Sequence, residues 1–156
     1  MEINKEPIEL IAKGIADKYR EILAGGNMNA TGNLSKAHTT VDIDGTKVNV
    51  YINLQPYWWW VETGRMGYGP DAPAEKKPPI GAIKKWIEDK PVTITARNGK
   101  IPSTTGVAHA IAWKIAREGI PGRRPLDKTL QSPEFESIIQ QIEIEILRQL
   151  KEQLFK

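Results

Sequence analysis

The stretch TTVDIDGTKVNVYINL, from Thr39 to Leu54, carries the strongest local structural signal of the chain. Polar and apolar residues alternate on both sides of Asp44 and Gly45. An Asp-Gly pair between two alternating segments is typical of a β-hairpin with a two-residue turn. We therefore expect an antiparallel hairpin here.

The position of the turn predicts which side chains share a face of the hairpin. With Asp44 and Gly45 in the turn, the expected cross-strand pairs are Ile43 with Thr46, Asp42 with Lys47 and Val41 with Val48. Apolar and charged pairs then fall on opposite faces. The residues expected on the buried face are Val48, Val50, Ile52 and Leu54, with Asn49, Tyr51 and Asn53 on the other face.

Four segments with apolar residues at helical spacing flank the hairpin. They run from Pro7 to Leu23, from Pro79 to the residue before Pro91, from a cap at Ser103–Thr105 to Gly119, and from Pro133 to Leu154. Small and apolar residues cover nearly every side of the third, so we expect a central helix. Truncation of its Trp113 to alanine should then cost roughly 3 to 5 kcal/mol. We expect the far end of the last helix to have no intramolecular partner. The predicted fold is α+β, a small antiparallel sheet built on the hairpin and packed against three to four helices.

Two connections are unusual for a small domain. Residues 64–79 contain seven glycines and prolines and few apolar residues, so we expect a flexible loop, and its composition would allow it to become ordered on assembly. Residues 92–101 alternate in polarity around Asn98 and Gly99, which predicts a short protruding ribbon.

The composition fits a single domain over residues 1–156, with 40% hydrophobic and 26% charged residues. Cysteine is absent and there are two histidines, so no disulfide framework or thiolate metal site can form. We expect no cofactor and no metal. No apolar run approaches the roughly 20 residues that cross a bilayer, and the start MEINKEPIEL lacks a signal-peptide pattern. We expect no membrane contact and a protein that is cytoplasmic where it is made.

No set of residues predicts catalysis. His109 lies in the most apolar helix, where a hydrogen-bonded structural histidine is the expected role, and His38 begins a strand. The glycine-rich GRMGYG lacks the ending of a phosphate-binding loop, and DIDG is followed by Lys47 where a calcium loop needs glycine. Because no nucleophile, base and orienting group can be assembled, we expect neither an enzyme nor a small-molecule substrate.

Charge is unevenly distributed along the chain. Residues 58–124 hold 12 Lys/Arg against 6 Asp/Glu, and the rest holds 10 against 13. A basic middle between acidic flanks could attract nucleic acid, an acidic partner or further copies of the chain head to tail. A solvated basic loop is the remaining interpretation.

The segment PYWWWVETGR, Pro56 to Arg65, places three tryptophans in a row. If the second strand of the hairpin continues through this run, Trp58 and Trp60 share one face, opposite Trp59. Two interpretations stay open. Either helices cover both faces and at least two tryptophans are core residues, or another protein chain covers one face, since aromatic and arginine side chains anchor interfaces.

Three segments in this order, YWWWVETGR, PPIGAIKKWIEDK and AHAIAWKIAREGIPGRRPLDKTL, resemble the tail-completion or minor tail component family of tailed bacteriophages, also described as head-tail joining or neck proteins. The shared pattern is an aromatic-V-E-x-G segment, a proline-led helix with a tryptophan, and a helix ending in K-x-x-x-G followed by R-P-[LF]. It covers Tyr57 to Leu130, about half the chain. The matching residues are Val61, Glu62, Gly64, Trp86, Gly119, Arg124, Pro125 and Leu126.

The resemblance implies a virion structural protein, a small α+β subunit that assembles as a six-fold ring at the top of the tail tube and meets the head connector. Expected partners are further copies of this chain, tail tube and head-connector proteins, and DNA as a passing contact. The interface residues that we predict are Trp58, Trp59, Glu62, Arg65, Lys76, Lys77, Arg123 and Arg124. The three consecutive tryptophans and the ribbon at 92–101 depart from the family pattern, which would suit a different neck position or partner.

The same tryptophans allow other functions. A sequence-tolerant single-stranded nucleic-acid-binding protein would stack bases on Trp58 or Trp59 beside a basic groove. A ligand-binding or carbohydrate-binding module would use the indoles as a platform, but few polar residues surround them.

Overall fold

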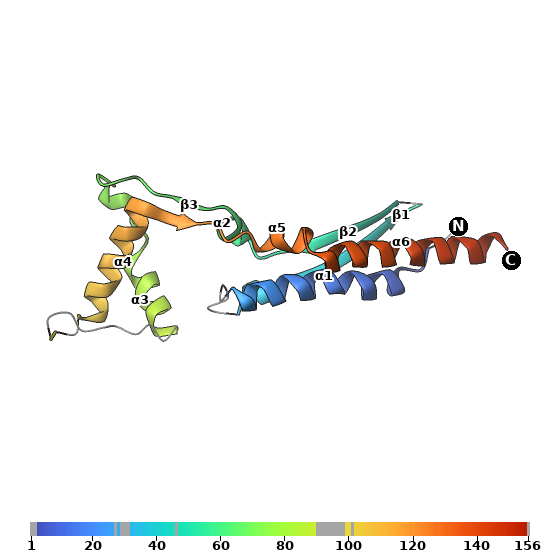
Figure 1. The fold of residues 1–156 in the computed structure, drawn as a ribbon, viewed down its shortest axis with the longest axis horizontal. Coiled ribbons are helices and arrows are strands. Elements are labelled where there is room, and N and C mark those ends of the chain that lie inside the picture. The colour runs from blue at the N-terminus through green and yellow to red at the C-terminus, as the bar shows by residue number, and fades with distance from the viewer. Residues whose placement is uncertain are drawn as a thin grey trace. The chain divides into compact units, whose positions relative to one another are not determined.

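The computed structural model describes residues 3–26, 28, 32–45, 47–89, 99–100 and 102–155 (Figure 1). In chain order the elements are α1 (Lys5–Gly25), the 3-10 helix η1 (Leu34–Lys36), β1 (His38–Asp44), β2 (Lys47–Asn53), α2 (Trp58–Thr63), β3 (Gly64–Met66), the 3-10 helix η2 (Ala74–Lys76), α3 (Ile80–Asp89), α4 (Thr104–Glu118), β4 (Gly119–Pro121), α5 (Pro125–Leu130) and α6 (Pro133–Leu154). They form two compact units, the first made of Met1–Trp58 and Arg124–Lys156, and the second of Trp59–Arg123. The fold class is α+β, as predicted.

The first unit is built on α1, which packs against both the β1–β2 hairpin and α6. Asn4 caps the helix, because its side-chain oxygen accepts a hydrogen bond of 3.1 Å from the Glu6 N–H. Apolar residues at helical spacing bury one face of α1: Ile8, Ala12, Ile15, Ala16, Tyr19 and Leu23. The core also contains Val41 from the hairpin and Ile142 from α6. The predicted first helix is therefore confirmed.

Helix α6 runs antiparallel to α1. Lys18 of α1 lies 3.0 Å from Glu134 at the start of α6, while Asn4 meets Gln149 near its end. The residues of α6 that pack on the core are Ile138, Ile142, Ile146 and Leu150, which recur at the helical spacing expected for this segment. The last turn of α6 extends past the start of α1 (Figure 1), and Leu154 there is 64% exposed. This exposure agrees with the expectation for the far end of the helix.

The hairpin forms, but its register differs from the prediction. The structure pairs Asp44 with Lys47, Ile43 with Val48, Asp42 with Asn49 and Val41 with Val50. The turn therefore starts at Gly45 and not at Asp44, because a glycine with φ of 60° fits the first turn position without a steric cost. Every partner shifts by two residues, so the faces stay as predicted. Val41 is buried, and Tyr51 lies exposed on the opposite face.

The second unit has a separate core between α3 and α4. The buried residues of α4 are Ala108, Ala112 and Ala116, four residues apart on one narrow face. His109 is exposed and Trp113 is 41% exposed, so the expectations of a central helix, a structural histidine and a core tryptophan are wrong. Alanines form the buried centre of the contact face, and the larger Val107, Ile111 and Ile115 pack against it partly buried.

A second sheet joins β3 to β4 and was not predicted. Its pairs are Gly64 with Pro121, Arg65 with Ile120 and Met66 with Gly119. Strands of three residues are too short for alternation to be recognised in a sequence. The two backbones approach so closely that a Cβ on Gly119 would lie 2.1 Å from the Arg65 carbonyl oxygen, and one on Gly64 would lie 2.3 Å from that of Ile120. This sheet therefore depends on both glycines.

Residues 64–79 are more ordered than the expected loop, since they contain β3, η2 and the buried Ala72. The Tyr68 N–H donates to the Ala116 carbonyl at 2.8 Å, and the Gly69 N–H donates to the Arg117 carbonyl at 2.9 Å. Backbone hydrogen bonds to the end of α4 thus hold residues 64–79 in place, although few of their side chains are buried. The ribbon expected at 92–101 lies outside the described residues, apart from 99 and 100. The single domain expected over residues 1–156 stays a prediction.

Candidate protein-binding site

The tryptophan run forms the short helix α2, so strand β2 does not continue through it and the face assignment that depended on such a continuation does not apply. The ladder between β1 and β2 ends at the pair of His38 and Asn53, and Pro56 beyond it has no N–H to donate to a neighbouring strand. Within α2 the Thr63 hydroxyl donates to the Trp59 carbonyl at 2.8 Å. Because each helical residue is rotated by about 100° from the last, the three indoles point in different directions.

The exposure of the tryptophans separates the two open interpretations. Trp59 is 54% exposed and Trp60 is 63% exposed, whereas Trp58 is half-buried. The interpretation that at least two of the three are core residues is therefore wrong. That another protein chain covers the exposed indoles stays a prediction.

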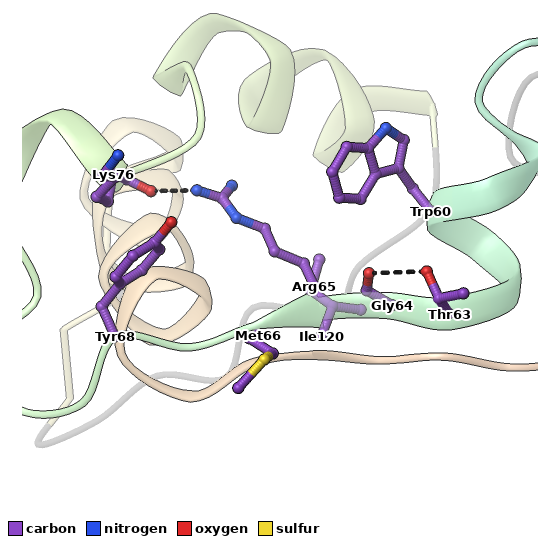
Figure 2. A pocket seen from close by; sticks show the side chains of 8 residues that line it. All are labelled: Trp60, Thr63, Gly64, Arg65, Met66, Tyr68, Lys76 and Ile120. Carbon is purple, nitrogen blue, oxygen red and sulfur yellow. Dashed lines mark hydrogen bonds between the residues drawn. The ribbon is translucent and has the colours of Figure 1, made fainter.

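The second unit contains a pocket of about 870 Å³, beside α2 and the β3–β4 sheet (Figure 2). Its lining residues are Trp60, Thr63, Gly64, Arg65, Met66, Tyr68, Lys76 and Ile120. We call it the Trp60 pocket. Most of its wall is apolar or aromatic, two of its residues are cationic, and none of these eight is acidic. A pocket of this size and lining suits apolar side chains accompanied by a carboxylate.

Arg65 extends across the Trp60 pocket toward Lys76 (Figure 2). Its Nη2 donates a hydrogen bond of 2.5 Å to the Lys76 carbonyl, and the Lys76 ammonium lies 5.5 Å from the ring centroid of Tyr68. A guanidinium has five N–H donors, so this bond is compatible with a second, bidentate contact to a carboxylate. The two cations are thus held on the same side of an aromatic cavity.

Lys77 points to a different aromatic ring. Its ammonium lies 3.3 Å from the ring centroid of Trp113, in a cation–π contact. This contact fastens the segment before α3 to α4, within the second unit. We therefore assign Lys77 a structural role in this unit.

The structure brings only some predicted interface residues together. Arg65 and Lys76 meet in the Trp60 pocket. The others lie elsewhere: Trp59 and Glu62 on α2, Lys77 over Trp113, Arg123 at the end of the second unit, and Trp58 and Arg124 in the first unit. Sequence reasoning missed Trp60, Met66, Tyr68 and Ile120 as site residues. No local signal marks Ile120, because only β3–β4 pairing carries it beside Arg65.

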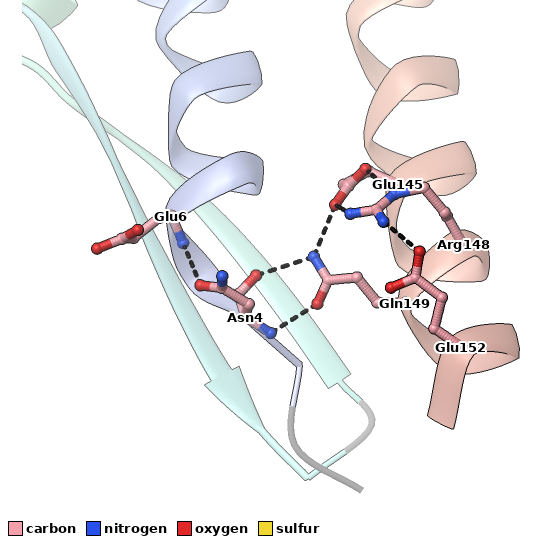
Figure 3. Close-up of polar contacts among 6 residues, drawn as sticks. All are labelled: Asn4, Glu6, Glu145, Arg148, Gln149 and Glu152. Atoms are coloured by element: carbon pink, nitrogen blue, oxygen red, sulfur yellow. Dashed lines mark hydrogen bonds and ion pairs between the residues drawn. The ribbon is translucent and has the colours of Figure 1, made fainter. Parts of the chain in front are cut away.

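A polar cluster joins the start of α1 to the end of α6 (Figure 3). Gln149 is buried, and its amide nitrogen donates to the Asn4 carbonyl at 3.1 Å and to Glu145 at 2.8 Å. Glu145 also accepts a hydrogen bond of 2.6 Å from Arg148, which contacts Glu152 as well. These contacts fix the two helices and form no open site.

Among the residues that the structure describes, the ionisable groups with shifted pKa values all belong to helix contacts. Hydrogen bonds from Arg148 and then Gln149 lower the pKa of Glu145 to about 2, and the same carboxylate raises the pKa of Arg148. At the other end of α6, the backbone N–H of Glu134 itself and then the Lys18 ammonium lower the pKa of the Glu134 carboxyl. These pKa shifts therefore reflect ion pairs and hydrogen bonds that hold helices of the first unit.

Within the part of the chain that the structure describes, no three His, Asp or Glu side chains gather as metal ligands would. None of the described helices combines the length and apolar character needed to span a bilayer. Comparison of the chain with family models, with curated proteins and with solved structures found no match. Inference of function therefore depends on the residues and the geometry above.

Proposed function

We propose that this chain is a structural virion protein of the neck of a tailed bacteriophage. It forms a ring of identical copies at the top of the tail, completes the tail and joins it to the head connector. The ring assembles in the cytoplasm of the bacterial host. The proposal is supported by the motif resemblance over Tyr57–Leu130 and by the aromatic surface of the second unit.

The observation that carries the proposal is the exposure of Trp59 and Trp60 on α2. Full burial of an aromatic side chain removes roughly 150 to 250 Å² from water, so two half-exposed indoles leave a substantial apolar surface. Tryptophan and arginine are enriched at the energetic centres of protein interfaces. Arg65 lies in the same pocket as Trp60. A protein partner is therefore the occupant that this chemistry favours.

A ring requires that one surface of each copy binds a different surface of the next copy. The second unit holds 11 Lys/Arg against 6 Asp/Glu, and the first holds 11 against 13. Opposite net charges on two parts of one chain favour head-to-tail contact and disfavour contact between like surfaces. This distribution supports a homo-oligomer with heterologous contacts, and the family resemblance supports six copies.

Mass measurement and electron microscopy of the purified chain test the proposal. We expect a closed oligomer with a central channel. Trp59→Ala and Trp60→Ala should raise its dissociation constant by about tenfold or more, since interface tryptophans are frequent hot spots. The free energy of unfolding should change by less than about 1 kcal/mol, because both indoles are exposed. Tyr51→Ala, at an exposed aromatic residue on the hairpin, is the control and should leave the oligomer unchanged.

A single-stranded nucleic-acid-binding protein is the second candidate, because Trp60 and Arg65 line one pocket and could stack and neutralise a nucleotide. A chain that stays monomeric and binds single-stranded DNA at micromolar concentration, with a steep salt dependence lost in Trp60→Ala, would favour it over the neck protein. The genes beside the reading frame test the placement in the virion. We expect head and tail structural genes on its two sides.

A further inference from the structure

Helix α6 carries apolar residues on two faces. One face packs on the core of the first unit through Ile138, Ile142, Ile146 and Leu150. A second set is formed by Ile144, Leu147 and Leu154, each more than half exposed, and Phe155 follows at 86% exposed. Spacings of three and seven residues keep the first three on one side of the helix. We call these four residues the outer stripe of α6.

Acidic residues accompany the outer stripe. Glu143 is exposed and lies one turn before Leu147 on the same face. Over its whole length α6 has five glutamates against Arg148 and Lys151. Arg148 is paired with Glu145 and Glu152 on its own helix. Lys151 is exposed one turn after Leu147, so the outer stripe has an acid at its Glu143 end and a base at its Lys151 end.

The Trp60 pocket has the complementary character. Trp60, Tyr68 and Ile120 supply apolar and aromatic wall, while Arg65 and Lys76 supply positive charge. Figure 2 shows the Arg65 guanidinium and the Trp60 indole on the same side of the β3–β4 sheet. Aliphatic side chains fit such walls, and a carboxylate beside them pairs with the cations.

We propose that the outer stripe of α6 docks into the Trp60 pocket of a second copy of this chain. Ile144 and Leu147 of one copy contact Trp60 and Ile120 of the next, and Glu143 faces Lys76. The inference rests on the self-assembly in the proposed function and names the two surfaces that meet.

Charge disfavours one symmetric alternative and leaves the other to be tested. Two outer stripes facing each other in antiparallel order would place Glu143 of one copy near Lys151 of the other, so cross-linking must distinguish paired α6 helices from the proposed contact. If two Trp60 pockets faced each other, Arg65 and Lys76 would meet their own copies. The contact between stripe and pocket places Glu143 beside the cations Arg65 and Lys76, and a contact between unlike surfaces is the kind that closes into a ring.

Disulfide cross-linking tests the contact directly, because the chain has no cysteine of its own. Leu147→Cys and Ile120→Cys are made in separate chains with tags of different mass, and the two chains are assembled together and oxidised. We expect a mixed disulfide between the two tagged chains. The control uses Ala82→Cys in place of Ile120→Cys. Ala82 is exposed on α3 outside the pocket, so we expect no mixed disulfide with Leu147→Cys.

A charge exchange gives a second readout that needs no oxidation. Glu143→Lys and Lys76→Glu should each weaken the oligomer by about tenfold or more at low salt, since each places like charges across the contact. The chain that carries both substitutions should recover most of the lost affinity, because the opposite charges again face each other. Both positions are exposed, so neither variant should impair folding.

The outcomes separate this inference from the proposed function. An oligomer that lacks the mixed disulfide and is unaffected by Glu143→Lys would overturn the inference and leave self-assembly standing. Disulfides mainly between two Leu147→Cys chains would overturn it in favour of paired α6 helices. A wild-type chain that is monomeric at every concentration would overturn both.

Discussion

The side-chain amide of Gln149 bonds both backbone polar groups of Asn4: its oxygen accepts from the Asn4 N–H at 2.6 Å, and its nitrogen donates to the Asn4 carbonyl at 3.1 Å. The two residues are 145 positions apart in the sequence. Figure 3 shows that this contact joins the beginning of α1 to the last third of α6. It therefore holds in place the helix that carries the outer stripe.

Gln149→Met should lower the free energy of unfolding by about 1 to 3 kcal/mol. Methionine matches the length of glutamine, but it leaves the N–H and the carbonyl of Asn4 without their partners. Urea denaturation measures the change. Gln140→Met, at an exposed position on the same helix, is the control and should stay within about 0.5 kcal/mol of the wild type. Equal effects of the two variants would contradict the structural role of the amide.

Stability should fall in acid through Glu145. Its pKa in the folded protein is lowered to about 2, from an ordinary value of 4.5, chiefly by the hydrogen bond from Arg148. Because the pKa of Glu145 is lower in the folded protein, its carboxylate contributes fully to folding stability at a pH above the ordinary pKa. This contribution is lost as the pH falls through the pKa of the folded state. Urea midpoints between pH 5 and pH 2.5 should therefore decline less steeply in Glu145→Gln than in the wild type. Glu143→Gln, at an exposed acid of the same helix, should keep the steeper decline.

Truncation of Trp113 should cost much less than removal of a buried tryptophan, because the side chain is 41% exposed. Its main specific contact is with the Lys77 ammonium, 3.3 Å from the ring centroid. A double-mutant cycle of Trp113→Ala and Lys77→Met should give a coupling energy of about 0.5 to 2 kcal/mol. The same cycle with Lys76→Met should give nearly none, since Lys76 lies over Tyr68. Similar coupling in both cycles would show that the contact is not specific.

Gly119→Ala should disrupt the β3–β4 sheet more than Gly69→Ala disrupts its own surroundings. Both glycines have a φ of 79°, so an alanine is strained at either position, and Gly119 with a ψ of −166° lies in a region that is essentially restricted to glycine. Only at Gly119 would the new Cβ meet another backbone, 2.1 Å from the Arg65 oxygen, whereas nothing lies within 4 Å at Gly69. The difference in unfolding free energy between the variants measures the close approach together with the strain of the Gly119 backbone. Hydrogen exchange at β3 should rise in Gly119→Ala alone.

The hairpin and the four longer helices were predictable because their signals are local. Alternation around Asp44 and Gly45 indicated two strands, and helical spacing indicated α1 and α6 close to their observed bounds. The predicted pairing register was wrong because the turn starts at Gly45, one residue after the expected Asp44. Both turns bury the same face of the hairpin, so alternation could not distinguish them. Periodicity therefore predicts the buried side of an element better than it predicts its exact partner.

The candidate site was only half predictable. Arg65 and Lys76 were identified from charge, and the importance of the tryptophan run was identified from its composition. The helix at Trp58–Thr63 was not identified, because a short aromatic run fits a strand or a helix equally well by its spacing alone. The exposure of Trp113 was not identified either. Which indoles are covered depends on neighbours that lie far away along the chain.

By itself, the sequence determined the α+β class, the inward faces of the hairpin and terminal helices, and the unequal distribution of charge. These features depend on residues within a few positions of one another. Only the tertiary structure decided that Ile120 lies beside Arg65 and that Lys77, but not Lys76, covers Trp113. It also decided that α6 has a second apolar face left in solvent. Three-residue strands and close backbone contacts leave no periodic signal, so their pairing is selected by the packing of the whole unit.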